Sequence, residues 1–295
     1  MTETAEWQCV MILWGTKYPV DLVNHQVRMI RALTSRPARF LLITDRPRDG
    51  LDPEIGELAF DPFFLNPAFM GPGCQAKLTM FSEGLVPIDL PAVFVDLDTV
   101  IVGDLSRVVD TLDRPERVRI LQSAILPFGP IGRLAYRLSG GKRYARGNSS
   151  VVLWHPAHGV EITERFRALY EEHGGLGLRP MIADERFISW CVQPRMGAIP
   201  KSVAVKFPNE FMHPLRFWLR LKGQMPWTRA RRAGLAAVTL PGEDIKPERL
   251  MALADGDTLR DRKGRWLIWS EATLGGLKAQ IRRYYEDRPD MAGGR

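Results

Sequence analysis

The spacing of apolar positions predicts a strand, a helix and a second strand near the start of the chain. Residues 7–13 form a nearly unbroken apolar run that is typical of a buried strand, and Trp14-Gly15-Thr16 ends it. Over residues 20–30, valine or isoleucine recurs every three or four positions, which indicates an amphipathic helix. Residues 40–43 form the next apolar run. This β-α-β order predicts a parallel sheet in an α/β fold.

The rest of the chain continues the alternation of apolar runs and helical periodicity. Two segments, 52–73 and 129–147, are rich in glycine with proline or basic residues and are expected to be loops. We place a domain boundary near residue 245, between a main domain, 1–245, and a C-terminal helical appendage, 246–295. Strands are expected at 92–95, 100–102, 118–122, 149–154, 203–205 and 235–240, and helices at 74–84, 160–172, 184–192 and 270–287.

The composition is that of an ordinary globular protein with a basic surplus. Hydrophobic residues make up 45% of the chain and charged residues 25%, so it can bury a sizeable core. The formal net charge of +7 predicts an anionic partner, such as nucleotide phosphates, nucleic acid or an anionic membrane. Charge alone does not choose among these partners.

We expect neither a secretory signal nor a bilayer-spanning segment. Residues 1–6 are polar and acidic, and the richest apolar stretch, 85–102, is interrupted by aspartates. Cys9, Cys74 and Cys191 lie too far apart along the chain for a metal-binding motif and are expected to be free thiols. These features predict a cytoplasmic protein.

The main chemical signal is a pair of acidic residues at the end of a predicted strand. Asp96 and Asp98 follow the apolar run 92–95, and ligands of α/β sheets bind at the carboxyl ends of strands. Two neighbouring carboxylates repel each other and lose hydration, and a hard divalent cation offsets both costs. Such a cation can then bridge a substrate diphosphate. Spacing alone equally fits two aspartates that cap a turn.

The acidic pair also fits the nucleophile motif of haloacid-dehalogenase-type phosphatases. In that interpretation Asp96 accepts the phosphoryl group and Asp98 acts as acid and base. The motif normally lies on the first strand of its domain, whereas two or three predicted strands precede it here. A phosphatase is therefore the weaker interpretation.

Several short segments elsewhere line up with the acidic pair in a fixed order along the chain. From about residue 8 to residue 250, the set resembles bacterial GT-A-fold glycosyltransferases related to family 8, including members from surface-polysaccharide clusters. The resemblance implies a mixed, mostly parallel sheet flanked by helices. The segments are Trp14-Gly15-Thr16-Lys17-Tyr18, Thr44-Asp45, Lys77-Leu78, the run from Asp96 to Leu105, Asn148-Ser149-Ser150 and Asp184-Glu185.

The resemblance implies a role for each segment. Asp96 and Asp98 would hold the metal, with Asp96 also meeting the ribose. Asp184 and Glu185 would lie at the donor sugar and the acceptor, as the catalytic candidates. The implied donor-binding residues are Trp14, Gly15 and Tyr18 around the nucleotide, Thr44 and Asp45 near the base, Lys77 at the phosphates or sugar, and Asn148 and Ser149 at the transferred sugar.

Each of these assignments has a structural alternative. Trp14 and Tyr18 can pack on the sheet, and Thr44-Asp45 can form a turn into Pro47. Lys77 can be a solvated helix residue. Asp184-Glu185 can cap the helix that they begin, because acidic residues favour helix N-termini.

The chain departs from the family pattern at two places. The relatives carry a segment of the type Phe-His-Gly-x-Pro-Lys-Pro, whose histidine is a third metal ligand and whose lysine meets the diphosphate. In the matching stretch, residues 239–247, Lys246 is present but Pro241 replaces the histidine, and His213 is a possible substitute ligand. Glu185 stands where a glutamine is usual, so a carboxylate there could act as base or nucleophile.

Residues 211–232 combine basic and aromatic side chains without an acidic residue. Basic residues interleaved with tryptophan and phenylalanine suit the surface of an anionic membrane, where they would bring the protein to a lipid-linked acceptor. The alternative is a solvated basic face whose aromatic side chains enter the core. The basic residues are Arg216, Arg220, Lys222, Arg229, Arg231 and Arg232.

Together these observations predict a metal-dependent glycosyltransferase. It would move a hexose from a nucleotide-sugar, first of all a UDP-sugar, to a saccharide or lipid-linked acceptor. The resemblance implies Mn²⁺ or Mg²⁺ as cofactor and retention of configuration. A phosphatase, a non-catalytic nucleotide-sugar-binding protein of the same fold and an RNA-binding protein are the rival hypotheses. We expect no nucleic-acid partner, and a cytoplasmic location with peripheral contact on the inner face of the membrane.

Overall fold

The computed structural model describes residues 4–122 and 128–286, which fall into two compact units. Unit 1 comprises Met1–Arg31, Ser35–Leu97 and Val108–Ile199, and unit 2 comprises Ala32–Thr34, Asp98–Arg107 and Pro200–Arg295.

This division differs from the predicted boundary at residue 245. Residues 98–107 and 200–245 join the C-terminal segment because their strands pair with one another in a separate sheet. Residues 246–286 of the predicted appendage belong to this larger unit, and residues 287–295 lie outside the described part of the chain.

Unit 1 is built on a seven-stranded sheet with the order β3-β2-β1-β4-β7-β6-β8. Strand β7 runs antiparallel to its neighbours β4 and β6, and the other paired strands are parallel. The mixed, mostly parallel sheet predicted from the sequence is therefore confirmed. The strands are β1 (Trp7–Leu13), β2 (Ala38–Thr44), β3 (Ile55–Ala59), β4 (Ala92–Val95), β6 (Val118–Gln122), β7 (Gly147–Trp154) and β8 (Met196–Ile199).

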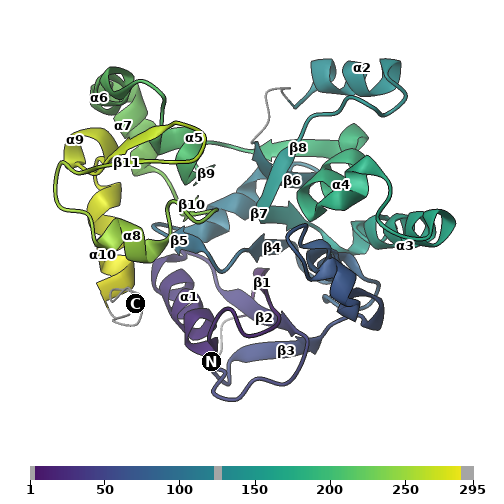
Figure 1. Cartoon of the computed structure of the whole chain (residues 1–295). Helices are drawn as coiled ribbons and strands as arrows, with labels where there is room; N and C mark the ends of the chain where they lie inside the picture. The colour runs from purple at the N-terminus through teal and green to yellow at the C-terminus, as the bar shows by residue number, and fades with distance from the viewer. Residues whose placement is uncertain (1–3, 123–127, 287–295) are drawn as a thin grey trace. The chain divides into compact units, whose positions relative to one another are not determined.

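Helices flank this sheet (Figure 1). The α-helices of this part of the chain are α1 (Val20–Leu33), α2 (Pro130–Leu138), α3 (Glu161–His173) and α4 (Asp184–Cys191). The 3₁₀ helices are η1 (Pro62–Leu65), η2 (Pro67–Phe69), η3 (Gln75–Phe81), η4 (Leu105–Thr111), η5 (Pro156–His158), η6 (Arg179–Ile182) and η7 (Gln193–Arg195).

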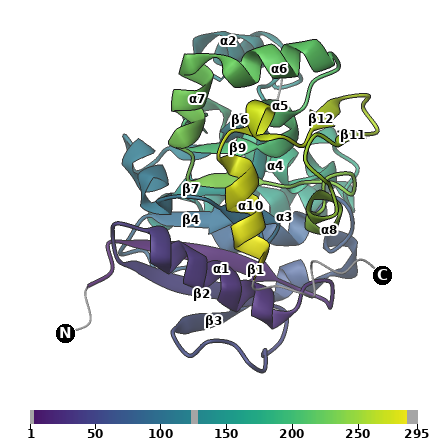
Figure 2. The same cartoon turned by 90° about the vertical axis from the view of Figure 1, so that its left-hand side faces the viewer.

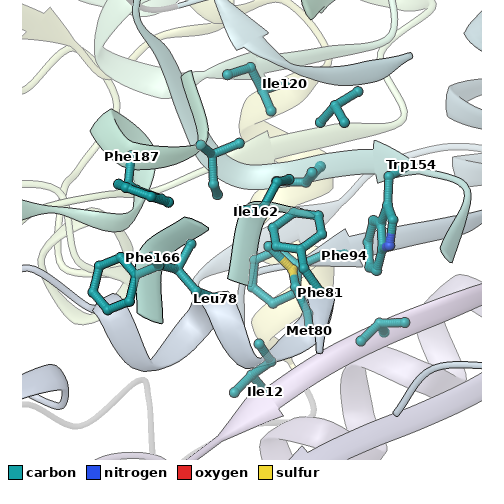
Figure 3. Close-up of a cluster of buried hydrophobic side chains, with 14 of the residues drawn as sticks. Ile12, Leu78, Met80, Phe81, Phe94, Ile120, Trp154, Ile162, Phe166 and Phe187 are labelled. Carbon is teal, nitrogen blue, oxygen red and sulfur yellow. The ribbon is translucent and has the colours of Figure 1, made fainter. Parts of the chain in front are cut away.

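The core of unit 1 lies between the sheet and the elements η3, α3 and α4. Alternate residues of a strand point to opposite faces, so Ile12 of β1 and Phe94 of β4 face this layer together. Figure 3 shows Phe94 next to Phe81 of η3, with Ile12 and Phe166 of α3 in the same cluster of buried side chains. Residues of β1 and β4 are buried along their whole lengths, as expected for central strands that are covered on both faces.

Two predicted loops contain regular structure. Segment 52–73 includes the edge strand β3, whose residues Ile55–Ala59 pair with β2 although few of them favour a strand. Segment 129–147 includes α2, in which Pro130 occupies the first turn, where its missing N–H costs no hydrogen bond. In both segments the short element is surrounded by glycines and prolines, so the composition of the whole segment predicted a loop.

Unit 2 contains two small sheets. Strand β10 pairs antiparallel with β5 and parallel with β9, and β11 and β12 form an antiparallel hairpin. The strands are β5 (Thr99–Ile101), β9 (Ala204–Lys206), β10 (Ala237–Thr239), β11 (Thr258–Arg260) and β12 (Trp266–Ile268). The helices are α5 (Phe207–Phe211), α6 (Arg216–Gln224), α7 (Pro226–Ala233), α8 (Pro247–Met251), α9 (Glu271–Leu274) and α10 (Leu277–Glu286).

The predicted C-terminal helix is interrupted. Gly275 has a φ of 63° and, with Gly276, separates α9 from α10. Figure 2 shows α10 as a yellow helix, and within unit 2 its Gln280 side chain donates a hydrogen bond to the Val102 carbonyl at 3.2 Å. Asp287, the predicted last residue of this helix, lies outside the described residues. None of the described helices combines the length and the apolar character needed to cross a membrane.

Candidate active site

The candidate site in unit 1 forms where the antiparallel strand β7 meets the end of β4. Val95, the last residue of β4, pairs with Val151, and the Asp96 N–H donates to the Ser150 carbonyl at 2.9 Å. The start of β7 therefore lies beside the carboxyl end of β4. The sheet brings Asn148 and Ser149 close to Asp96, although about fifty residues separate them in the chain.

A shift of register in β7 shapes this corner. Ile120 of β6 pairs with Val152, but the next residue, Leu121, pairs with Asn148. Residues 149–151 thus have no pairing partner on β6, and an irregularity of this kind turns side chains away from the regular pleat. The side chains of Asn148 and Ser149 are then available for contacts with α4.

Three short contacts connect the predicted residues of unit 1. The Lys77 ammonium donates to Asp96 Oδ2 at 2.5 Å. The Ser149 hydroxyl donates to Asp184 Oδ2 at 2.6 Å, and the Asn148 amide donates to Glu185 Oε2 at 2.9 Å. Six residues that the sequence placed in four separate segments therefore form two linked groups at one edge of the sheet.

The backbone before η3 fixes the start of α4. The Asp184 N–H donates to the Gly73 carbonyl at 2.9 Å. A Cβ atom on Gly73 would lie only 2.4 Å from the Ile182 carbonyl oxygen, so this approach requires glycine. Gln75 adds a side-chain hydrogen bond to the Met181 carbonyl at 2.9 Å. These contacts hold η3, which carries Lys77, against the first turn of α4.

The buried charges around Lys77 influence one another. Burial disfavours the charged lysine, but Asp96 and Asp184 outweigh this effect and hold the pKa of the Lys77 ammonium above its usual range. Burial raises the pKa of Asp184 to about 6, against the opposing influence of Lys77 and the Ser149 hydroxyl. Asp184 therefore exchanges its proton close to neutral pH, in the range that suits a general acid or base.

The raised pKa of Asp184 predicts a stability cost that a substitution can remove. The pKa of Asp184 is about 6 in the folded protein and 3.8 in the unfolded chain, so the folded protein holds this proton more tightly. The free energy of unfolding therefore falls as the pH rises toward 6. We expect Asp184→Asn to be more stable than the wild type at about pH 8, by at most about 3 kcal/mol. Near pH 4 the two proteins should be equally stable. Urea unfolding of both proteins at these two pH values tests the prediction. A lower free energy of unfolding for Asp184→Asn than for the wild type at about pH 8 would contradict it.

The loops after β1 and β2 are tied together by an aspartate and arginines. Asp45 Oδ2 accepts from the Gly15 N–H at 3.1 Å, and Asp45 Oδ1 is paired with Arg48. Arg48 also donates to the Thr44 hydroxyl at 2.8 Å and to the Gly15 carbonyl at 3.0 Å. Both oxygens of Asp45 are thus engaged in the turn, and a contact of Thr44 or Asp45 with a nucleotide base stays a prediction. The arginines directly after Thr44-Asp45 offer a local ion-pair partner for Asp45, but their positions in the sequence do not determine which of them folds back onto it.

The aromatic residues after β1 are half-buried. The Trp14 ring lies edge-on to Phe60, with 6.4 Å between the ring centroids. The Lys17 ammonium lies 5.4 Å from the centre of the Tyr18 ring. Trp14 therefore packs on the edge of the core, and the donor-binding role of Trp14, Gly15 and Tyr18 is still a prediction.

In unit 2, Asp98 lies at the start of the small sheet. Its carbonyl accepts from the Leu240 N–H at 3.0 Å, and its Oδ2 lies 3.7 Å from the Lys246 ammonium. The segment that aligns with the family's metal and diphosphate motif therefore packs against the second residue of the acidic pair. Both aspartates have a lysine partner, Asp96 in unit 1 and Asp98 in unit 2.

The acidic residues offer hard oxygen ligands but no complete protein cage for a metal. Among residues 4–122 and 128–286, no three His, Cys, Asp or Glu side chains gather as ligands. His213 pairs through its backbone with Trp266, and its Nδ1 accepts from the Leu215 N–H at 3.1 Å, so it serves a local turn. Asp96 and Asp98 each offer a carboxylate, the kind of ligand that Mg²⁺ and Mn²⁺ prefer, and their role as metal ligands stays a prediction.

The basic and aromatic stretch divides into buried charges and exposed rings. Glu210, itself buried, is paired with Lys222, Arg231 and Arg232, so half of the basic residues neutralise a carboxylate inside unit 2. Of the aromatic side chains in this stretch, Phe211 enters the core, as the alternative interpretation required, whereas Phe217, Trp218 and Trp227 do not. The exposed fractions are 68% for Phe217, 37% for Trp218, 42% for Leu221 and 69% for Trp227.

The described cysteines are free, as expected from their spacing. Cys9 is buried in β1, and burial holds the pKa of its thiol above the usual range. Cys74, the residue directly before η3, has a φ of 53°, a left-handed conformation that is uncommon for a residue with a side chain.

Comparison with solved structures finds bacterial glycosyltransferases. The galactosyltransferase LgtC, solved with donor and acceptor sugar analogues, superimposes with a TM-score of 0.58 over 98% of this chain and 97% of its own, at 11% sequence identity. The bifunctional glycosyltransferase WbbM superimposes with a TM-score of 0.56 over 96% of this chain and 52% of its own, at 12% sequence identity. The glycosyltransferase GlyE from Streptococcus pneumoniae TIGR4 superimposes with a TM-score of 0.50 over 96% of this chain and 64% of its own, at 11% sequence identity.

No protein-family model matches the sequence, and no curated protein matches it. At 11 to 12% identity the structural likeness establishes the architecture and not the activity. The chain therefore has the GT-A-like fold of these bacterial glycosyltransferases.

Proposed function

We propose that this protein transfers a hexose from a nucleotide-sugar, with UDP-sugars as the first candidates, to a saccharide or lipid-linked acceptor. The observation that carries the proposal is the group formed by Asp96, Lys77, Ser149 and Asp184 at the carboxyl end of β4. Buried acidic and basic side chains at this edge of an α/β sheet are typical of a ligand site. The GT-A-like fold supports the same reaction class.

Asp96 and Asp98 are the proposed ligands of Mn²⁺ or Mg²⁺. One residue separates them, which keeps their Cα atoms within about 7 Å of each other whatever the backbone conformation. A bound dication would supply positive charge that offsets the departing nucleoside diphosphate. Lys77 and Lys246, each already paired with one of these carboxylates, would turn toward the diphosphate oxygens when the donor binds.

Asp184 and Glu185 are the proposed residues at the transferred sugar. Ser149 and Asn148 each orient one of these carboxylates through a hydrogen bond. Glu185 is accessible enough to meet a sugar hydroxyl or the anomeric carbon, and we propose retention of configuration. The anomeric proton coupling of the product, measured by NMR, checks this assignment.

The phosphatase hypothesis needs a second acidic pair, and residues 256–261 carry the required Gly-Asp-x-x-x-Asp spacing. Both aspartates have structural partners there. Asp257 accepts from the Ala254 N–H at 2.8 Å. Asp261 accepts from the Arg265 side chain and from the N–H groups of Lys263 and Arg265, all within the hairpin β11–β12. The geometry thus favours a turn at this motif and gives the phosphatase hypothesis no support.

A thermal-shift screen of nucleotide-sugars with and without Mn²⁺ tests the proposal. At a donor concentration one hundred times its dissociation constant, we expect stabilisation of about 2.7 kcal/mol, or about 5 °C in Tm. The shift should require both the metal and a nucleoside diphosphate group. Each nucleotide-sugar that stabilises the protein is then prepared with a radiolabelled sugar and mixed with candidate acceptors. The label that appears in the acceptor measures sugar transfer.

Each hypothesis has its own outcome in this screen. Stabilisation followed by sugar transfer supports the glycosyltransferase, and stabilisation without transfer to any acceptor supports a non-catalytic binder. Release of phosphate from a phosphomonoester supports the phosphatase. Salt-sensitive RNA binding that survives loss of Asp96 and Asp98 supports an RNA-binding protein. Indifference to every donor and metal would contradict our proposal.

The exposed rings of α6 and α7 are the proposed membrane contact of unit 2. Phe217 and Trp227 expose about two thirds of their surface, and Arg220 adds positive charge on α6. An aromatic surface with basic neighbours fits the interface of an anionic membrane. Such a contact would bring the enzyme to a lipid-linked acceptor.

A further inference from the structure

Helix α2 of unit 1 exposes an apolar stripe that the sequence did not predict. Ile131, Leu134 and Leu138 expose 67%, 57% and 80% of their surface. Spacings of three and four residues place them on one face of the helix. Gly132, on another face, is the buried residue of α2. Three large apolar side chains exposed together on one helix mark an interaction surface rather than scattered surface residues.

The surroundings of this stripe are strongly basic. Residues 128–160 contain no acidic side chain. The basic residues of the α2 segment form no ion pair with any residue that the structure describes. Arg179 and Arg186 add further positive charge near Tyr144. The segment's own basic residues are Arg133, Arg137, Lys142, Arg143 and Arg146.

We propose that α2 lies in the surface of an anionic lipid bilayer, with Ile131, Leu134 and Leu138 in the boundary between headgroups and acyl chains. A short amphipathic helix with basic residues on its polar side is the structure that binds such an interface. Phospholipid headgroups of negative charge supply the counter-ions that unit 1 does not. This inference is independent of the proposed reaction, because it concerns binding alone.

Other partners fit this surface less well. Pairing the same face with a second copy of the chain would oppose two sets of unneutralised basic residues across one interface. RNA would engage the arginines but leave the apolar stripe in water. An anionic bilayer satisfies the charge and the apolar stripe together.

The segment after α2 connects this surface to the candidate site within unit 1. The backbone of Ala145 exchanges two hydrogen bonds with the Gln193 side chain, at 3.2 and 2.7 Å. A Cβ atom on Gly141 would lie 3.3 Å from the Trp190 ring nitrogen. Trp190 belongs to α4, the helix that begins with Asp184 and Glu185. If the proposed function holds, a bilayer bound by α2 would orient the catalytic helix toward a lipid-linked acceptor.

Vesicle sedimentation tests the proposal. The full-length protein is mixed with phosphatidylcholine vesicles that contain or lack phosphatidylglycerol. We expect binding only with the anionic lipid, and weakening by added salt. The variant Ile131→Gln, Leu134→Gln, Leu138→Gln should lose about tenfold or more in affinity, because the lost burial is that of three side chains. Gln favours helices, so α2 should keep its structure.

Matched variants distinguish the possible results. Ile88→Gln removes a side chain of unit 1 that is 64% exposed outside α2 and should bind like the wild type. Phe217→Gln with Trp227→Gln tests the surface of unit 2 separately. Unchanged vesicle binding by the α2 variant would overturn the inference. So would a concentration-dependent dimer in size-exclusion chromatography that the α2 variant abolishes. Loss of sugar transfer with normal vesicle binding would concern the proposed function alone.

Discussion

Asp98→Asn is expected to lower sugar transfer by about three orders of magnitude while the protein remains folded. The substitution keeps the size of the side chain and removes the charge that would bind the dication. Without that dication, the negative charge on the departing nucleoside diphosphate is no longer offset. Asp98 Oδ2 lies 3.7 Å from the Lys246 ammonium in unit 2, and an asparagine keeps the shape and an acceptor oxygen at this position, so the variant should still fold. Initial rates at saturating donor and a range of Mn²⁺ concentrations measure the effect.

Asp255→Asn is the matched control for this substitution. Asp255 is also an aspartate of unit 2 that is paired with a lysine, Lys278, but no proposed ligand or substrate contacts it. The control should transfer sugar at the wild-type rate. In the thermal-shift assay, Asp98→Asn should also lose the stabilisation that requires metal and donor together. If Asp98→Asn transferred sugar at the wild-type rate, without dependence on added metal, the proposed metal dependence of the reaction would be wrong.

The sequence was sufficient to predict the elements that place the candidate site. Strands β1, β2, β4 and β7 are central, and their buried apolar runs leave few alternatives for their position in an α/β fold. The residues directly after or at the start of these strands must then gather at one edge of the sheet. Strand geometry alone predicted the position of Asp96 at the end of β4, and Ser149 and Asp184 were grouped with it only through the resemblance to family-8 glycosyltransferases.

The contacts within the site could not be predicted in the same way. Whether Asp45 faces a nucleotide or an arginine depends on where Arg48 folds back, and no periodicity encodes that choice. The shift of register in β7 depends on its pairing with β6, which is distant in the chain. Strand β3 is held by its pairing with β2 more than by its own propensity, and α2 is short and contains Pro130 and Gly132, so the composition of both segments indicated loops.

Lys77→Met is expected to reduce the free energy of unfolding by about 3 to 5 kcal/mol at about pH 8. The lysine is 8% exposed, and its removal leaves two carboxylates, Asp96 and Asp184, without their buried counter-charge. The pKa of Asp184, already raised to about 6, should rise further in the variant. Asp184 then takes up a proton as the pH falls, so the loss of stability should be smaller at about pH 5.

A double-mutant cycle assigns this loss to the buried charges. In an Asp184→Asn background one of the two unpaired carboxylates is already neutral, so Lys77→Met should cost less by about 1 kcal/mol or more. Lys278→Met, which breaks the ion pair with the exposed Asp255, should cost less than about 1 kcal/mol at every pH. Equal losses for Lys77→Met in both backgrounds, with no dependence on pH, would mean that Lys77 contributes through packing on Phe94 and not through its charge. The site would then lack the electrostatic coupling between Lys77 and Asp184 on which their proposed roles depend.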